Sequence, residues 1–298
     1  MFIKNIYNKL SDRRWTIGFL QNSIESVIRG EELRVQWMRH NYKDRWFADP
    51  FILDVDDSYI HVLAEEYYMP IKRAYIAKLT IDKKSKTLID TTPILKLNTH
   101  LSYPAIIRSG KEIFVYPESG QSGKLILYKY DFNTEKLIEY RELLKEDVGD
   151  ATYTNLFGED LLFCTKPPLY NDNLLYIYRK ENGRFVYSER IVFNDNIARM
   201  AGDFFTVNGK VYRPAQDCNK SYGNGLVIQE VNQYQGKWNF KELHRYYSPN
   251  LDYPLGIHTF NMYKEVITVD AVGYWHPTIA KFLTFLKSCF YTRISRRQ

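Results

Sequence analysis

The sequence is poor in cysteine and has no long apolar run, and both absences narrow the class of protein. Its three cysteines, Cys164, Cys218 and Cys289, cannot all pair and show no metal-ligand spacing, which favours a reducing compartment. No stretch reaches the roughly 18 uncharged residues of a membrane span, and residues 1–14 lack the apolar core of a signal peptide. We therefore expect a cytoplasmic protein.

The net positive charge is also modest, and the basic residues are scattered along the sequence. The formal net charge is +6 over 298 residues without a long basic tract in the body of the chain, so nucleic acid is not an expected partner. The sequence shows no metal cluster, nucleophilic Ser/His/Asp set or phosphate-cradling glycine loop, so we expect no metal and no cofactor. Aromatic residues, in contrast, are abundant. The 25 Tyr and 17 Phe favour pleated, half-buried surfaces, and Tyr also lines sugar-binding clefts.

Five segments share one pattern, in which a small or polar residue precedes an apolar strand, a tight polar turn and a second apolar strand. The positions taken as equivalent are Asp49, Pro104, Ala151, Gly202 and His258. Their spacings of 55, 47, 51 and 56 residues are close to the ~40–50 residues of a four-stranded propeller blade. The turns that follow are Asp56-Asp57, Ser109-Gly110, Gly158-Glu159, Asn208-Gly209 and Tyr263-Lys264.

Further short strands complete each repeat, and helical periodicity is almost absent before residue 275. The clearest pairs are 125–132 with 137–144, 174–179 with 185–193, and 226–231 with 238–244. The sequence therefore predicts an all-β fold, a five-bladed β-propeller over residues 1–274. A β-sandwich is the alternative, but it would not require five equal units. The fifth repeat has only about two strands, so we expect residues 15–19 or 34–40 to close the ring.

The pattern changes over residues 275–298. Apolar residues recur there at three- and four-residue steps, with basic residues between and after them: Ile279, Phe282, Leu283, Leu286 and Phe290. This predicts a basic amphipathic C-terminal helix. The helix would either pack on the propeller or lie on an anionic membrane surface, which would make the protein peripheral on the inner membrane.

In a propeller, one end of every inner strand converges on the central axis, so residues far apart in sequence meet there. Four of the five lead-in segments carry polar or ionisable residues, namely Asp49, Asp150, Asp203 and His258. The second strands end with further acids that include Glu118 and Asp270. An Asp at a strand end can simply cap a turn. Gathered together, however, carboxylates supply the acid and the base or nucleophile of glycosidic chemistry.

The fourth repeat has the densest motif, with two arginines beside two aspartates over 199–203 and 213–217. Such groups form a buried ion network or bind a carboxylate or phosphate in a fork. Aromatic residues that could stack on a sugar include Tyr116 and Tyr222. The predicted catalytic residues are Asp49, Glu118, Asp150 and Asp203. The predicted substrate-binding residues are Trp46, Tyr103, Tyr153, Arg199, Arg213, Asp217 and His258.

Several of these motifs resemble known carbohydrate-active families. Residues 46–51 (WFADPF) look like the first-blade Asp motif of the five-bladed glycoside hydrolases of family 43. Residues 199–203, 213–217 and 256–261 resemble the N-terminal propeller of glucosamine inositolphosphorylceramide transferase. Similar propellers occur in bacteria in settings of surface-polysaccharide synthesis. The resemblance covers roughly residues 46–273.

The hydrolase resemblance implies roles for individual residues. Asp49 matches the general base, Asp150 the aspartate that tunes the acid and orients the sugar, and His258 a histidine near the axis. The general-acid glutamate should open the fourth blade, where this chain has 199–203 (RMAGD) instead. Asp203 or Glu118 would then have to serve as the acid. The transferase also has its own catalytic domain, and this chain contains nothing like it.

The sequence thus predicts a carbohydrate-active propeller of bacterial surface-polysaccharide biosynthesis, which acts on a glycosyl bond by transfer or hydrolysis. Its expected partner is a glycan, a sugar nucleotide or a lipid-linked sugar. The alternative is a non-catalytic glycan-binding module that serves a partner glycosyltransferase, and the absent blade-four glutamate favours it. A protein-interaction propeller without sugar binding is a third hypothesis.

Overall fold

The computed structural model describes residues 13–276 and 278–279, and their strands form five four-stranded sheets. The first three sheets each use consecutive strands. Blade 1 consists of β3 (Arg45–Val55), β4 (Tyr59–Tyr68), β5 (Arg73–Asp82) and β6 (Leu88–Leu95). Blade 2 consists of β7 (Ser102–Ser109), β8 (Glu112–Glu118), β9 (Leu125–Asp131) and β10 (Lys136–Leu144). Blade 3 consists of β11 (Gly149–Leu156), β12 (Glu159–Thr165), β13 (Leu174–Glu181) and β14 (Arg184–Val192).

The fourth sheet also uses consecutive strands, whereas the fifth does not. Blade 4 again takes consecutive strands, β15 (Phe205–Val207), β16 (Lys210–Asp217), β17 (Gly225–Tyr234) and β18 (Lys237–Tyr246). Blade 5 joins β19 (Phe260–Tyr263) and β20 (Val266–Tyr274) to β1 (Arg13–Leu20) and β2 (Val35–Trp37). The short helical segments are α2 (Ile24–Ile28), η1 (Met69–Ile71) and η2 (Gly120–Ser122).

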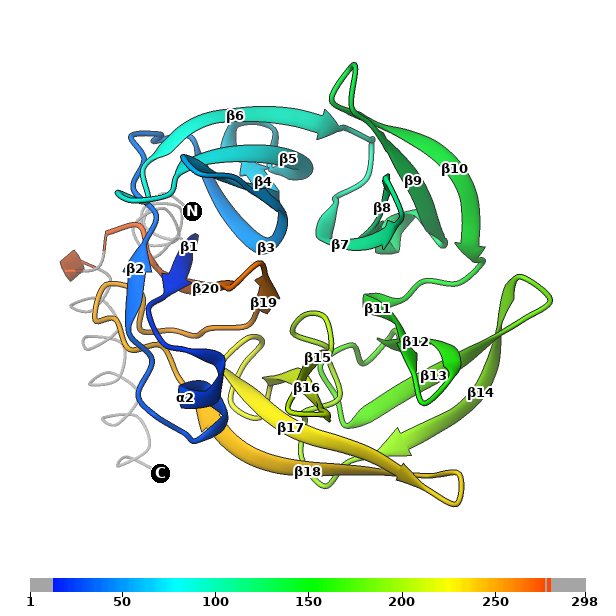
Figure 1. The fold of residues 1–298 in the computed structure, drawn as a ribbon. Coiled ribbons are helices and arrows are strands. Elements are labelled where there is room, and N and C mark those ends of the chain that lie inside the picture. Colours follow the sequence, from blue (N-terminus) through cyan, green and yellow to red (C-terminus); the bar gives the residue numbers. More distant parts are fainter. Residues whose placement is uncertain (1–12, 277, 280–298) are drawn as a thin grey trace, which may run out of the picture.

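The five sheets surround a central axis, with β3, β7, β11, β15 and β19 innermost (Figure 1). The predicted five-bladed propeller is therefore confirmed. Strand β1 runs antiparallel to β20, from the pair Arg13 and Tyr274 to the pair Phe19 and Thr268. Both N-terminal segments considered as closing strands are used, because 15–19 lies in β1 and 34–40 contains β2. The ring therefore has no open edge between its first and last blades.

Tight turns with two residues at positive φ join many of the hairpins. Asn208 and Gly209, for example, have φ values of 50° and 76°, which suit the twist of antiparallel strands. In blade 5 the turn predicted at Tyr263-Lys264 lies one residue later. Lys264 and Glu265 adopt the positive φ values, 45° and 64°, without a glycine at either position.

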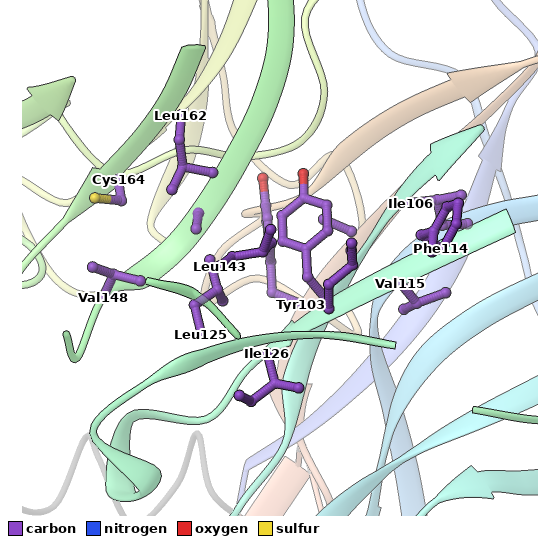
Figure 2. Close-up of a cluster of buried hydrophobic side chains, with 14 of the residues drawn as sticks. Tyr103, Ile106, Phe114, Val115, Leu125, Ile126, Leu143, Val148, Leu162 and Cys164 are labelled. Atoms are coloured by element: carbon purple, nitrogen blue, oxygen red, sulfur yellow. The ribbon is translucent and has the colours of Figure 1, made fainter. Parts of the chain in front are cut away.

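The apolar core fills the spaces between neighbouring blades, because each sheet packs against another sheet on both of its faces. In β12 the five residues from Leu161 to Thr165 are all buried, with no in-and-out alternation. The largest buried cluster runs from blade 1 through blades 2 and 3, and Figure 2 shows part of it, including Leu125 and Leu143 of blade 2 and Leu162 of blade 3. This continuous packing holds the inner strands in place around the axis.

The predicted amphipathic helix over 275–298 falls almost entirely outside the described residues. Within the part that is described, no helix has the length and apolar character needed to cross a bilayer.

Candidate functional site

The axial site is built on β-bulges near the start of the inner strands. In blades 1, 2 and 3 the register shifts between Ala48 and Phe51, Ser102 and Ala105, and Gly149 and Thr152. One residue inside each bulge has a positive φ, at Asp49 (49°), Tyr103 (46°) and Asp150 (44°). The equivalent positions in blades 2 and 3 are thus Tyr103 and Asp150, one residue before the predicted Pro104 and Ala151.

A carboxylate from the preceding blade holds each of these strained residues. The backbone N–H of Asp49 donates to Asp270 Oδ2 at 2.9 Å, that of Tyr103 to Asp49 Oδ2 at 3.0 Å, and that of Asp150 to Glu118 Oε2 at 2.8 Å. A non-glycine residue in this conformation costs about 1–2 kcal/mol, and it persists only where the surrounding contacts require it. The axial carboxylates therefore have a structural role as well as any chemical one.

The first group of the site, here called the histidine cluster, consists of Asp49, His258, Thr259 and Asp270. Asp270 Oδ1 accepts from His258 Nδ1 at 2.7 Å and from the Thr259 N–H at 3.0 Å. The Thr259 hydroxyl lies 3.0 Å from Asp49 Oδ1, and His258 Nε2 lies 3.6 Å from the same oxygen. Trp15, from β1, stacks on the imidazole with ring centroids 3.9 Å apart.

The second group, the arginine cluster, consists of Glu118, Asp150, Arg199 and Gln216. Arg199 donates Nε to Asp150 Oδ2 at 2.6 Å and Nη2 to Asp150 Oδ1 and Glu118 Oε2 at 3.2 Å each. Gln216 Nε2 also donates to Asp150 Oδ2, at 2.5 Å. Arg199 thus holds Asp150 with two parallel bonds and Glu118 with one, so its partners are acids of other blades and not the aspartates of its own repeat.

Burial and neighbouring charges move the pKa values of His258, Asp49 and Glu118 away from their usual ranges. Burial alone would lower the pKa of His258, but the Asp270 carboxylate outweighs burial and raises it to about 9. Burial raises the pKa of Asp49 to about 8, against the opposing charge of His258. Burial likewise raises the pKa of Glu118 to about 8, and the Asp150 carboxylate adds to the rise while Arg199 opposes it. One arginine faces two carboxylates, so Glu118 is the one that takes up a proton.

Aromatic and polar side chains of blade 1 form a rim beside Asp49. The rings of Trp46 and Tyr67 stack in parallel, with centroids 4.6 Å apart and an interplanar angle of 4°. Tyr67 lies next to His100, whose Nε2 pairs with Glu65 Oε1 at 3.0 Å. Glu65 is opposite Ala48 in the β3–β4 ladder, which places this rim one residue from Asp49.

Asp203 lies outside both clusters. In blade 4, Met200 pairs with Ala215 and Phe205 pairs with Tyr212. The four residues 201–204, which include Asp203, therefore lie opposite only two residues of β16 and form a bulge. Burial raises the pKa of the Asp203 carboxyl to about 7, although the charge of Arg108 opposes the rise. The side chain makes no hydrogen bond within the described part of the chain.

Other predicted binding residues also lie apart from the clusters. Arg213 is fully buried (0% exposed), and its guanidinium donates to the carbonyls of Ile197 and Ala198 and to Gln229 Oε1. Burial lowers its pKa to about 9. These bonds fix the backbone immediately before Arg199, so Arg213 helps to position the arginine cluster without contacting its carboxylates.

The remaining three residues serve local structure. Tyr103 is buried and bonds through its hydroxyl to Thr152 Oγ1 at 2.9 Å, tying blade 2 to blade 3. The Tyr153 hydroxyl donates to Asp160 Oδ1 at 2.8 Å. Asp217 Oδ1 accepts from the N–H of Asn219 at 3.0 Å, which fixes the start of the loop after β16. Among the described residues, none of these three side chains makes a hydrogen bond to a member of the histidine cluster or the arginine cluster.

The sequence reasoning missed several members of the site. Asp270 was noticed only as an acid at a strand end, yet it accepts hydrogen bonds from Asp49, His258 and Thr259. The Thr259 hydroxyl and Gln216 also have no sequence signal of their own. Their roles arise from contacts between blades, in which the bonded residues are 66 to 221 positions apart in sequence.

Asp49, His258 and Asp270 offer three ligand atoms within 4.8 Å of one another, a spacing that could hold a metal ion. The donor set suits an ion poorly in the charge state described here. A doubly protonated imidazole has no free lone pair, and the Asp270 oxygens already accept bonds from five groups. The expectation of no metal stays a prediction.

Solved structures with a similar fold come from glycoside hydrolase family 43. A β-xylosidase/α-arabinofuranosidase from a compost microbial metagenome superimposes with a TM-score of 0.54 at 10% identity, covering 81% of this chain and 94% of that chain. A family 43 enzyme from Xanthomonas citri gives 0.55 at 7% identity, covering 78% and 87%. At such low identity, the likeness shows the fold alone.

Sequence comparison identifies relatives of another kind. Glucosamine inositolphosphorylceramide transferase 1 of Oryza sativa subsp. japonica is 28% identical over 154 residues, and that of Arabidopsis thaliana is 27% identical over 145 residues. These matches cover 48% and 44% of this chain but 20% and 18% of the relatives, so the chain spans about a fifth of their length. Residues 35–250 match the family described as glucosamine inositolphosphorylceramide transferase 1, N-terminal. With well over half of its length matched, this chain belongs to that family.

Proposed function

We propose that this chain binds a carbohydrate at the axial site and acts on a glycosyl bond, by transfer or by hydrolysis. The observation that carries the proposal is a pair of carboxyl groups, Asp49 and Glu118, whose pKa values both lie at about 8. They stand in neighbouring blades, and the charge of Asp150 acts on both. Groups with pKa values near the working pH are the ones suited to acid–base catalysis.

Each carboxyl group has a separate task in the proposed reaction. Glu118, whose side chain is 18% exposed, is protonated at neutral pH and gives its proton to the leaving oxygen as the bond from that oxygen to the anomeric carbon breaks. Ionised Asp49 takes the proton of the attacking hydroxyl, from water or an acceptor sugar, as the new bond to carbon forms. Asp150, held by Arg199, faces the developing positive charge of the sugar. Proton exchange with solvent then restores both groups.

Substitution of either acid tests this assignment. Asp49→Asn and Glu118→Gln should each lower turnover by about 10²–10⁴-fold, the usual contribution of general acid–base catalysis. Because Asp49 must be ionised and Glu118 protonated, kcat/KM of the wild-type protein should rise and then fall in a narrow bell centred near pH 8. The assay would follow release from aryl glycosides and transfer from sugar nucleotides. Asp160→Asn, at an acid far from the axis that bonds to Tyr153, is the control. Activity retained in Asp49→Asn would refute the role of Asp49.

One observation favours a second function, a non-catalytic glycan-binding module for a partner glycosyltransferase. Arg199 occupies the segment where family 43 hydrolases would place their acid glutamate, and its bonds to Asp150 and Glu118 restrain both carboxylates. In that case the wild-type protein would bind sugars but turn over no donor. Binding without turnover across the same panel would select this function over the first.

The proposed setting is bacterial surface-polysaccharide assembly, in the cytoplasm and at the inner membrane. The support is the basic composition of residues 275–298, which include Lys281, Lys287, Arg293, Arg296 and Arg297. We expect the full chain to sediment with vesicles that contain anionic lipid and the chain ending at residue 274 to remain in the supernatant. Equal sedimentation of the two chains would argue against a membrane contact through this segment.

A further inference from the structure

One aromatic side chain contacts both clusters of the axial site. Tyr222 lies in the loop between β16 and β17, and its ring stands edge-on to His258, with centroids 5.2 Å apart at 81°. The Cζ atom of Arg199 lies 5.1 Å from the centre of the same ring. Tyr222 therefore bridges the histidine cluster and the arginine cluster, which belong to different blades.

Two glycines, Gly223 and Gly256, allow the loop that carries Tyr222 to approach blade 5 closely. A Cβ on Gly256 would lie 1.9 Å from the Gly223 carbonyl oxygen, and a Cβ on Gly223 would lie 3.0 Å from His258 Cβ. Gly223 also has a φ of 64°, which side chains rarely adopt. Only glycine permits this approach, so the loop conformation that puts Tyr222 at the axis is built into the fold.

The polar end of Tyr222 lacks a protein partner. The residue is 37% exposed, and its hydroxyl makes no hydrogen bond to any residue in 13–276 or 278–279. Burial of that end raises the pKa of the phenol well above its usual value, with Arg199 opposing and Asp150 and Asp49 adding to the rise. The hydroxyl is therefore a neutral donor and acceptor set among the charged groups of both clusters.

A phenol ring with a free hydroxyl suits one kind of ligand. The apolar face of a sugar ring packs on an aromatic ring, and its hydroxyls need partners that donate and accept. Trp15, whose ring centroid lies 6.3 Å from that of Tyr222, adds a second aromatic wall. A small anion would instead need a free cation here, but Arg199 is already paired with Asp150 and Glu118, and the His258 imidazole is paired with Asp270.

We infer that Tyr222 contacts the bound ligand directly, with its ring against the sugar and its hydroxyl bonded to a sugar oxygen between the two clusters. This inference rests on the proposed carbohydrate binding at the axial site. It adds a residue that is supplied by a loop rather than by an inner strand. Tyr222 is accordingly a determinant of which sugar binds, whether or not the bond is then cleaved.

Sugar binding by matched variants tests the inference without relying on turnover. The probes are the methyl glycosides of xylose, galactose, glucose and N-acetylglucosamine, with affinity measured by saturation-transfer NMR and calorimetry. For the tightest probe we expect Tyr222→Phe, which keeps the ring, to weaken binding about 10-fold, and Tyr222→Ala about 100-fold. Tyr234→Ala, at a residue that is 73% exposed in the β17–β18 hairpin, should bind as the wild type does.

The outcomes separate the inference from the function on which it rests. If the wild type binds a probe and Asp49→Asn weakens it, while both Tyr222 variants bind normally, the contact is refuted and the proposed function stands. Tighter binding by Tyr222→Ala would show that the ring blocks the site, and that result also overturns the inference. If the wild type binds none of the probes, the proposed function fails and the inference fails with it.

Discussion

Replacement of Arg199 by methionine should destabilise the folded chain by about 3–5 kcal/mol, because breaking a buried ion pair leaves its partners uncompensated. Arg199 is nearly buried and is bonded to Asp150 and Glu118, and both carboxylates would remain in the interior without a counter-charge. The pKa of Glu118, already raised to about 8 by burial, would rise further because Arg199 would no longer oppose the rise. The variant therefore loses further stability as the pH rises, and its deficit relative to the wild type should be larger at pH 8 than at pH 5.5.

Urea unfolding at the two pH values measures this effect, and a surface ion pair provides the control. Arg29 pairs with Glu31 at 2.7 Å, close to the 2.6 Å of Arg199 and Asp150, but its side chain is 62% exposed. Arg29→Met should cost no more than about 1 kcal/mol. Neutralising the acids in the triple variant Arg199→Met, Asp150→Asn, Glu118→Gln should recover part of the loss. A cost for Arg199→Met equal to that for Arg29→Met would show that the axial ion network contributes little to stability.

Truncation of Ile17 to alanine should cost about 2–5 kcal/mol, which is the usual range for a large apolar side chain in a packed core. Ile17 is fully buried in β1, opposite Asp270 in the β1–β20 ladder. Its carbonyl also accepts from the N–H of Met38, which continues the contact toward the outer strand of blade 5. The substitution therefore weakens the closure of the ring and the strand that carries Asp270.

A graded series distinguishes this effect from the general cost of a smaller residue. Ile17→Val should cost about 0.5–1.5 kcal/mol. Ile138→Ala, on the outer strand β10 at a residue that is 54% exposed, should change the free energy of unfolding by well under half as much as Ile17→Ala. Equal costs at Ile17 and Ile138 would mean that β1 adds little to the stability of the closed ring.

Most of the propeller could be predicted because its signals are local. Turn residues such as Asn208 and Gly209 mark hairpins, and their recurrence at nearly equal spacing reveals the blades. The register near the axis could not be predicted, since a bulge inserts a residue without a change in composition. Pro104 and Ala151 were therefore placed one residue beyond Tyr103 and Asp150, which hold the equivalent bulge positions.

The site was predicted less completely than the fold. The grouping of Asp49, Glu118, Asp150, Arg199 and His258 follows from topology, because inner strands converge. The two arginines of blade 4, however, look alike in the sequence. Arg199 faces the carboxylates at the axis, whereas Arg213 lies inside the blade between the rings of Phe193 and Phe240. Their difference depends on where each side chain points, which the motif does not encode.

The way in which blade 5 is assembled has a consequence for synthesis on the ribosome. Strand β1 is synthesised before every other strand described here and pairs with β20, so Arg13 must wait for Tyr274, which follows 261 residues later (274 minus 13). At about 5–20 residues per second, this interval lasts roughly 13–50 s. Blades 1 to 4 can form in the order of their synthesis during that time, while β1 exposes its apolar residues and an unpaired edge. Completion of the ring, and with it the contact between Trp15 and His258, is then the last step in the folding of the propeller, and chaperones have their clearest target in strand β1.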